Sequence, residues 1–188
     1  MRTKNVLLTG LALVLLLSVV GLAYSLLSAG YDADAVPSGQ DVAPEQADES
    51  VAAPDFAMLN ADGETIRLSD FQGTPVVLNF WATWCPPCRQ ELPHFADAYA
   101  EYGDRVAFLI VDLADGRQET IEDAQAFMTE QGYIFPVCYD TEMEGAYAYG
   151  VSAIPTTYFI NADGTIHSYQ IGALTRELLY DSLVKLLE

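Results

Sequence analysis

The octapeptide Trp81-Ala82-Thr83-Trp84-Cys85-Pro86-Pro87-Cys88 decides how the rest of this sequence is interpreted. The mostly apolar run 75–81 leads into it and is typical of a strand buried on both faces. After it, from about Pro86 or Pro87, apolar side chains recur every three or four positions, as they do along one stripe of a helix. Two cysteines three residues apart at such a strand-to-helix junction can form a disulfide that closes a small ring.

The position of Cys85 at the start of the predicted helix favours reactivity. Only the thiolate form of cysteine is nucleophilic, and the unpaired N–H groups and the macrodipole at a helix N-terminus stabilise an anion. Pro86 and Pro87 suit the first turn, where a missing N–H costs nothing. We therefore expect an accessible Cys85 to attack a partner disulfide and Cys88 to resolve the mixed disulfide, or the reverse cycle to oxidise a dithiol.

Two other uses of the cysteine pair are weaker. A zinc site would need two more ligands, and the remaining candidates Cys138, His94 and His167 lack the spacing of a zinc finger. A purely structural disulfide between residues on one helical turn would restrain little loop entropy. We therefore expect a redox-active disulfide, with no metal and no cofactor. Cys138, in a predicted strand, is expected to be a small buried hydrophobic residue.

The chain around this segment alternates strand and helix patterns, which predicts an α/β domain. Strands are expected at 56–59, 65–68, 75–81, 106–111, 133–139, 156–160 and 165–171, and helices at 86–102, 120–131, 142–149 and from 175 onward. The strand–helix–strand unit 75–111 should have a right-handed crossover. Thr120 is a good N-cap for the helix 120–131, and Gly132 is expected to end it.

Composition limits the class of protein. With 188 residues, 51% of them hydrophobic, the chain can form one ordinary globular domain with additional segments. Its 27 acidic and 8 basic residues give a net charge of −19, which repels phosphate backbones and excludes nucleic-acid binding as a main role. Three cysteines are too few for a disulfide-stapled miniprotein. An enzyme or carrier with a small reactive site remains.

The first 28 residues have the pattern of a membrane anchor. Arg2 and Lys4 precede an apolar run of 22 residues, 6–27, that contains no charged residue. As a helix this run spans about 33 Å, which suffices for a hydrocarbon core of about 30 Å. Cleavable signal peptides usually have a shorter apolar region. We favour an uncleaved signal anchor over a long cleaved signal peptide, with Arg2 and Lys4 in the cytoplasm and the rest of the chain outside.

Residues 29–54 should link this anchor to the globular domain 55–188. They contain three prolines and six acidic residues, with no basic residue and almost nothing that could fill a core. Such a segment is expected to be extended and mobile. The sequence therefore predicts a single-pass cell-membrane protein whose catalytic domain is tethered outside the cytoplasm.

The segment 81–93 closely resembles the active-site segment of thioredoxin-fold proteins of the TlpA/ResA type, which are membrane-tethered, extracytoplasmic thiol–disulfide oxidoreductases. The resemblance extends from about Ala53 to the C-terminus. It implies a thioredoxin-like fold: a central mixed β-sheet flanked by helices, with an N-terminal β-hairpin and a helical insert near 118–131. The segment 150–160 resembles the second signature of the family, which implies that Pro155 is cis and faces the CxxC motif, and that the backbone of Ile154 pairs with the partner's chain.

Glu91 lies almost one helical turn after Cys88, about 60° from it around the helix axis and at the edge of the apolar stripe. A carboxyl group there would be partly desolvated, with a raised pKa, and could carry a proton for the Cys88 thiol. The alternative is a solvated helix carboxylate. Members of the family have a glutamate at the matching place that tunes the thiols, so the resemblance favours the first role.

The predicted substrate-binding surface surrounds the cysteine pair and consists of Trp84, Pro86, Pro87, Ile154 and Pro155. Trp81, by contrast, is expected to pack in the core. We expect a monomeric reductase that receives electrons from a membrane thiol transporter and passes them to disulfide-containing partner proteins. Candidate partners are the CxxCH segment of an apocytochrome c and a secreted methionine sulfoxide reductase, and the acidic surface could steer basic partners.

Two alternatives on the same fold remain open. One is a disulfide-forming oxidase, and the other is a redox-gated binding module that docks partners without turnover. A measured reduction potential separates reductase from oxidase, because about −270 mV is typical of a reductant and about −120 mV of an oxidant.

Overall fold

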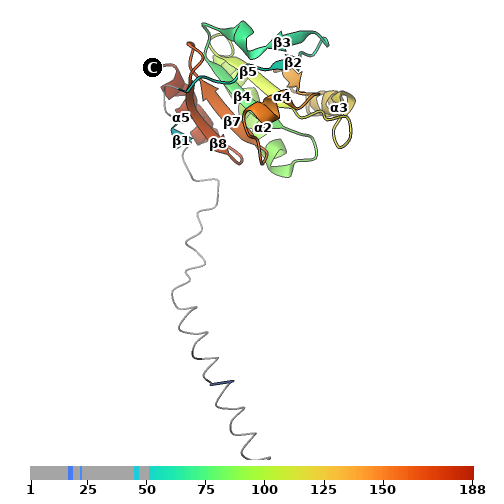
Figure 1. Ribbon diagram of the computed structural model, residues 1–188, viewed down its shortest axis with the longest axis vertical. Helices are drawn as coiled ribbons and strands as arrows, with labels where there is room; N and C mark the ends of the chain where they lie inside the picture. The colour runs from blue at the N-terminus through green and yellow to red at the C-terminus, as the bar shows by residue number, and fades with distance from the viewer. Residues whose placement is uncertain (1–16, 19–21, 23–44, 47–50) are drawn as a thin grey trace, which may run out of the picture. The chain divides into compact units, whose positions relative to one another are not determined.

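The computed structural model describes residues 17–18, 22, 45–46 and 51–188 (Figure 1). Apart from residues 17–18 and 22, the predicted anchor 1–28 lies outside the described residues, as does most of the predicted linker 29–54. In the described part of the chain, no helix is both long and apolar enough to cross a membrane. By its internal contacts the chain divides into Met1–Pro37 and Ser38–Glu188, and the elements that follow belong to the second unit.

An eight-stranded mixed sheet runs through this unit in the order β1-β8-β7-β4-β5-β6-β2-β3 (Figure 1). Its strands are β1 (Glu45–Gln46), β2 (Ala57–Leu59), β3 (Thr65–Arg67), β4 (Val76–Trp81), β5 (Ala107–Asp112), β6 (Val137–Tyr139), β7 (Thr156–Ile160) and β8 (Ile166–Ile171). β4 and β6 both pair in parallel with β5, whereas β7 pairs antiparallel with β4 and with β8. The predicted mixed sheet and the predicted hairpin, β2–β3, are both confirmed.

The helices begin and end close to where the sequence predicts them. They are α2 (Pro86–Tyr102), α3 (Ile121–Gln131), α4 (Glu144–Ala148) and α5 (Arg176–Leu186), and a short 3₁₀ helix, η2 (Leu68–Phe71), follows β3. Thr120 caps α3 by accepting the Asp123 N–H, and Gly132 ends it with a φ of 71°, a left-handed conformation that favours glycine. Thr175 caps α5 in the same way, so the local signals at these ends are confirmed.

Hydrophobic residues cover both faces of the sheet. Along β4 the side chains alternate, so that Val77 and Trp81 pack in one cluster and Leu78 and Phe80 in the other. The first cluster contains the apolar faces of α2, α3 and α5, whereas the second contains the buried side chains of β2 and Tyr149. The amphipathic pattern predicted for α2 thus places Cys88 against the sheet, on the face covered by α5.

Two predicted boundaries differ from the structure. The predicted strand 133–139 is formed only at Val137–Tyr139, since Pro136 has no N–H to donate to a neighbouring strand. The end of the predicted linker joins the sheet: Glu45 and Gln46 pair with β8, and Ala52 forms an isolated bridge with Thr165. The edge of β8 offers unpaired backbone groups that even a polar segment can satisfy, so an unfavourable composition did not exclude pairing there.

Candidate active site

The cysteine pair lies at the first turn of α2, where the sequence predicts it. Cys85 and Cys88 form a disulfide. Cys85 is the N-cap of the helix, with extended backbone angles, and its Sγ accepts the backbone N–H of Cys88 at 3.2 Å. Pro86 and Pro87 occupy the first helical positions. Once the disulfide is reduced, the same N–H and the helix macrodipole would stabilise a thiolate at Cys85.

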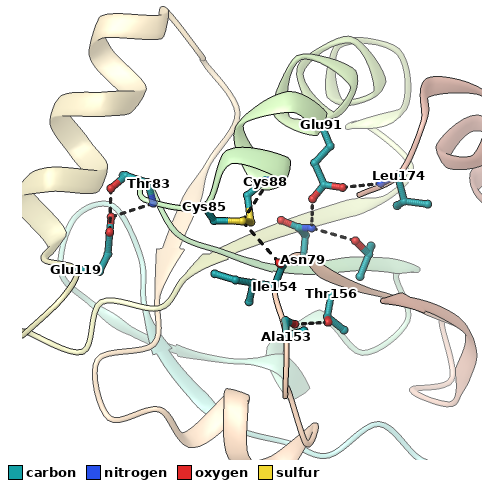
Figure 2. Close-up of a disulfide and its surroundings, with 11 residues drawn as sticks. Asn79, Thr83, Cys85, Cys88, Glu91, Glu119, Ala153, Ile154, Thr156 and Leu174 are labelled. Carbon is teal, nitrogen blue, oxygen red and sulfur yellow. Dashed lines mark hydrogen bonds between the residues drawn. A yellow bond between two sulfur atoms is a disulfide. The ribbon is translucent and has the colours of Figure 1, made fainter. Parts of the chain in front are cut away.

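The sequence predicts an accessible nucleophile at Cys85, but the structure shows this residue to be enclosed. In the disulfide form 2% of Cys85 and none of Cys88 is exposed. The carbonyl oxygen of Ile154 lies 3.7 Å from the Cys85 Sγ (Figure 2), and because a disulfide sulfur has no proton we treat this as a covering contact. Neighbouring Trp84 is 46% exposed, so Cys85 lies just beneath the surface, under the segment that contains Ile154.

The covering segment has the backbone that the family resemblance implies. The Ile154–Pro155 peptide bond is cis, as predicted. Pro155 is buried and Ile154 is half-buried. The Thr156 hydroxyl donates to the carbonyl of Ala153 at 2.7 Å, which ties the two sides of this turn together (Figure 2). The structure therefore brings the predicted Ile154 and Pro155 next to Cys85.

Glu91 is buried one turn further along α2, with 1% of its surface exposed. One carboxyl oxygen accepts from the Asn79 amide at 2.9 Å and the other accepts the Leu174 N–H at 2.8 Å. Burial raises the pKa of Glu91 to about 8, although both hydrogen bonds favour the charged form and partly offset this effect. The predicted rise in pKa is confirmed, and the group is fully rather than partly desolvated.

A surface hollow next to Glu91 offers a route for protons. Its lining includes Gln90, Glu91, His94 and Thr175, at the junction of α2 with the start of α5. Glu91 thus combines a raised pKa of about 8 with a place in the lining of this hollow, three residues after Cys88 on α2. These are the properties that proton transfer to or from a thiol requires.

Several polar residues that support the site were not identified from the sequence. Asn79 lies in β4 beneath Glu91 and also donates to the Thr157 hydroxyl at 2.9 Å. On the other side of the disulfide, Thr83 donates its N–H and its hydroxyl to the two carboxyl oxygens of Glu119, at 3.2 and 2.8 Å (Figure 2). Asn79 could have been identified from the sequence, because a polar amide in the middle of the apolar run 75–81 needs buried hydrogen-bond partners. Glu119 lies in a charged loop, and nothing in the sequence distinguishes it from the exposed acidic residues there.

The third cysteine and the first tryptophan have the predicted structural positions. Cys138 is buried in β6, and burial raises its pKa to about 11, so it stays a thiol at neutral pH. It packs in the cluster on the opposite face of the sheet from Cys85 and Cys88. Trp81 is fully buried, and its ring centroid lies 5.7 Å from the ring centroid of Phe127. Cys138 therefore has no contact through which it could join the disulfide.

Comparisons with known proteins agree with this geometry. Residues 50–169 match the AhpC/TSA family. The thiol-disulfide oxidoreductase ResA of Oceanobacillus iheyensis is 39% identical over 132 residues, which cover 68% of this chain and 67% of that protein. The ResA of Bacillus subtilis is 32% identical over 174 residues, which cover 92% of this chain and 88% of that protein.

Solved structures show the same fold. StoA of Bacillus subtilis superposes with a TM-score of 0.61 and 30% identity, over 71% of this chain and 98% of that one. The exposed lipoprotein thioredoxin Etrx1 of Streptococcus pneumoniae superposes with a TM-score of 0.62 and 30% identity, over 70% of this chain and 99% of that one. The chain is thus similar to these two solved structures over about 70% of its length.

Proposed function

This chain belongs to the AhpC/TSA family and is a thioredoxin-like thiol–disulfide oxidoreductase, and from that premise we propose that it reduces disulfides of partner proteins outside the cytoplasm. The observation that supports the proposal is the place of Cys85. Its sulfur accepts a helix N-terminal N–H from Cys88 and lies beneath the Ile154 carbonyl. One contact stabilises a thiolate and the other marks where a partner chain would lie.

The reaction transfers two electrons and needs no further group. The Cys85 thiolate attacks one sulfur of the partner disulfide, which breaks that bond and releases the other partner sulfur as a thiolate. The ionised form of Glu91, which is the minor form at pH 7 because of the raised pKa, then accepts the Cys88 proton. The Cys88 thiolate attacks Cys85 in the mixed disulfide, which releases the second partner sulfur as a thiolate. The two partner thiolates take up one proton from Glu91 and one from water, so the products are a partner dithiol and the Cys85–Cys88 disulfide, which is the state of the structure.

Docking of the partner is assigned to the residues around Cys85. Trp84, Pro86 and Pro87 are exposed, while Ile154 and Pro155 form the adjoining turn. Because Cys85 is only 2% exposed, a partner must displace the Ile154 segment slightly or pair with its backbone. Backbone pairing would be tolerant of the partner's sequence and would place an extended chain next to the reactive sulfur.

The proposed location and the proposed partners rest on the sequence. The apolar run 6–27 supports an anchor at 1–28, with the part of the segment 29–54 that precedes β1 as a tether and the catalytic domain outside a single-pass membrane segment. The proposed electron donor is a membrane thiol transporter. The proposed acceptors are an apocytochrome c CxxCH segment or a methionine sulfoxide reductase, met by a monomer whose net charge of −19 favours basic partners.

Trapping tests this proposal directly. Cys88→Ser removes the resolving thiol, so the variant should accumulate a mixed disulfide between Cys85 and its partner in the native membrane. The double variant Cys85→Ser/Cys88→Ser is the matched control and should capture nothing. A redox titration of the wild type against glutathione then gives the direction, with about −270 mV expected and about −120 mV indicating an oxidase instead. Absence of any Cys85-linked adduct would contradict the proposal.

A further inference from the structure

Thr83 is the one residue of the loop before Cys85 whose backbone and side chain both bind the same carboxyl group. Its N–H and hydroxyl donate to the two oxygens of Glu119. Glu119 is 1% exposed, although it comes from the loop before α3 and is 36 residues away in sequence. A buried carboxyl that receives two donors from one residue fixes that residue, and here it fixes the loop two positions before Cys85.

A second buried carboxyl lies against Glu119. Asp112 ends β5 directly opposite Trp81, the last residue of β4, and none of its surface is exposed. Neither carboxyl oxygen of Asp112 has a hydrogen-bond partner in the described part of the chain. The Glu119 carboxyl is near enough to raise the pKa of Asp112, and two carboxyl groups can form a hydrogen bond only when one of them has a proton.

Both the burial of Asp112 and the charged groups near it disfavour its ionisation. Burial contributes most, and the charges of Glu119 and of Asp123 at the start of α3 add to it, so the pKa of Asp112 rises to about 9. Tyr139, on the neighbouring β6, is also within electrostatic range. The raised pKa therefore keeps a proton on Asp112 at neutral pH, while the Glu119 carboxyl accepts from Thr83.

We propose that Asp112 and Glu119 act as one proton-sharing pair that positions the active-site loop: neutral Asp112 donates to Glu119, and Glu119 holds Thr83, which sets the position of Cys85 at the helix N-terminus. Both are positioning residues, since neither touches the sulfur atoms. Loss of the Asp112 proton in alkaline solution adds a negative charge to the buried pair and weakens the loop. The proposal rests on Cys85 as the exchanging thiol of the proposed function, but not on any partner or direction of electron flow.

The protonation of Asp112 is tested in the oxidised protein, where Cys85 and Cys88 do not titrate. We would record ¹³C NMR spectra of the side-chain carboxyl carbons of labelled full-length protein against pH. One aspartate carbon should have the shift of a neutral acid at pH 7 and ionise near pH 9, and Asp112→Asn should remove this signal. Glu119→Gln should lower the midpoint of this signal by about one unit or more, whereas Glu122→Gln, which removes an exposed carboxyl in the first turn of α3, should not. An ionised Asp112 at pH 7 would overturn the proposal.

The positioning role is tested in the reduced protein by the pH profile of Cys85 alkylation. Glu119→Gln and Thr83→Val should shift the profile to higher pH and slow alkylation at pH 7 by about tenfold, the effect of losing one hydrogen bond to a charged group. Thr83→Ser keeps the hydroxyl and should restore the wild-type profile, which a role in general packing would not predict. If Glu119→Gln does not fold, Thr83→Val decides. An unshifted profile in Thr83→Val disproves positioning, whatever partner the trapping experiment finds.

Discussion

The carboxyl of Glu91 accepts the backbone N–H of Leu174 at 2.8 Å, although the two residues are 83 positions apart. This bond joins α2, which contains the cysteine pair, to the loop before α5. The same carboxyl accepts from Asn79 in β4, so one buried acid connects a helix, a strand and a loop around the disulfide. A change in its protonation should therefore affect both the thiol chemistry and the stability of the fold.

Glu91→Gln should flatten the dependence of stability on pH. Because the pKa of Glu91 is raised from 4.5 to about 8 in the folded protein, the folded state binds more protons than the unfolded state between these values. This stabilisation is complete below pH 4.5 and is lost as pH rises toward 8, by up to about 1.4 kcal/mol per pH unit for one proton. Urea unfolding of oxidised wild type and variant at pH 5, 6.5 and 8 measures it.

Asp112 contributes a slope of the same sign in both proteins, so the difference between wild type and Glu91→Gln isolates Glu91. Glu130→Gln, which removes an exposed carboxyl on α3, is the control and should keep the wild-type slope. Parallel stability curves for wild type and Glu91→Gln would show that Glu91 is ionised at neutral pH.

Asn79→Ala should raise the pKa of Glu91 further, because it removes a donor that stabilises the carboxylate. It should also lower the free energy of unfolding by about 1–3 kcal/mol, since a buried carboxyl oxygen loses its partner. Thr157→Val is the matched control: it removes the other partner of the Asn79 amide but keeps the bond to Glu91. Carboxyl ¹³C titration should therefore show a higher Glu91 midpoint in the first variant alone.

Local signals explain which features could be predicted from the sequence. The cap at Thr120, the stop at Gly132 and the start of α2 at Pro86 depend on neighbouring residues, and each has the predicted place. Cys85 and Cys88 are close because they are three residues apart. The raised pKa of Glu91 followed from its place at the edge of the apolar stripe.

Long-range pairs were not predictable in this way. The sequence showed a polar Asn79 in a buried strand, but not that Glu91 and Thr157 would satisfy it. Glu119 belongs to a charged loop in which exposed and buried acids look alike. The enclosure of Cys85 by Ile154 depends on a segment 69 residues away. Such contacts are set by how the sheet orders its strands rather than by any local pattern.

Cys138→Ala should leave disulfide exchange intact. Cys138 is buried in β6, in the cluster on the face of the sheet opposite the disulfide, and its raised pKa keeps it an unreactive thiol. Insulin-disulfide reduction by this variant should match the wild type, whereas Cys85→Ser should abolish it. A large loss of activity in a folded Cys138→Ala protein would indicate a third redox thiol.

Trp84→Ala should separate partner docking from thiol chemistry. Trp84 is 46% exposed beside a cysteine that is only 2% exposed, so a protein partner must contact it to reach the sulfur. Exposed tryptophans are frequent energetic centres of protein interfaces. We expect KM for a protein disulfide such as insulin to rise several-fold, while the rate with a small aromatic disulfide stays within about twofold, because loss of one rim contact leaves the sulfur's environment unchanged.

The matched control is Tyr147→Ala, which removes an aromatic side chain that is 82% exposed on α4. Tyr147 is not among the residues assigned to the docking surface, so its loss should change neither substrate's kinetics. If Trp84→Ala slows both substrates equally, Trp84 acts on the reactivity of Cys85 rather than on docking. Unchanged kinetics with both substrates would remove Trp84 from the docking surface and leave recognition to the Ile154 backbone, since a backbone contact is unaffected by either substitution.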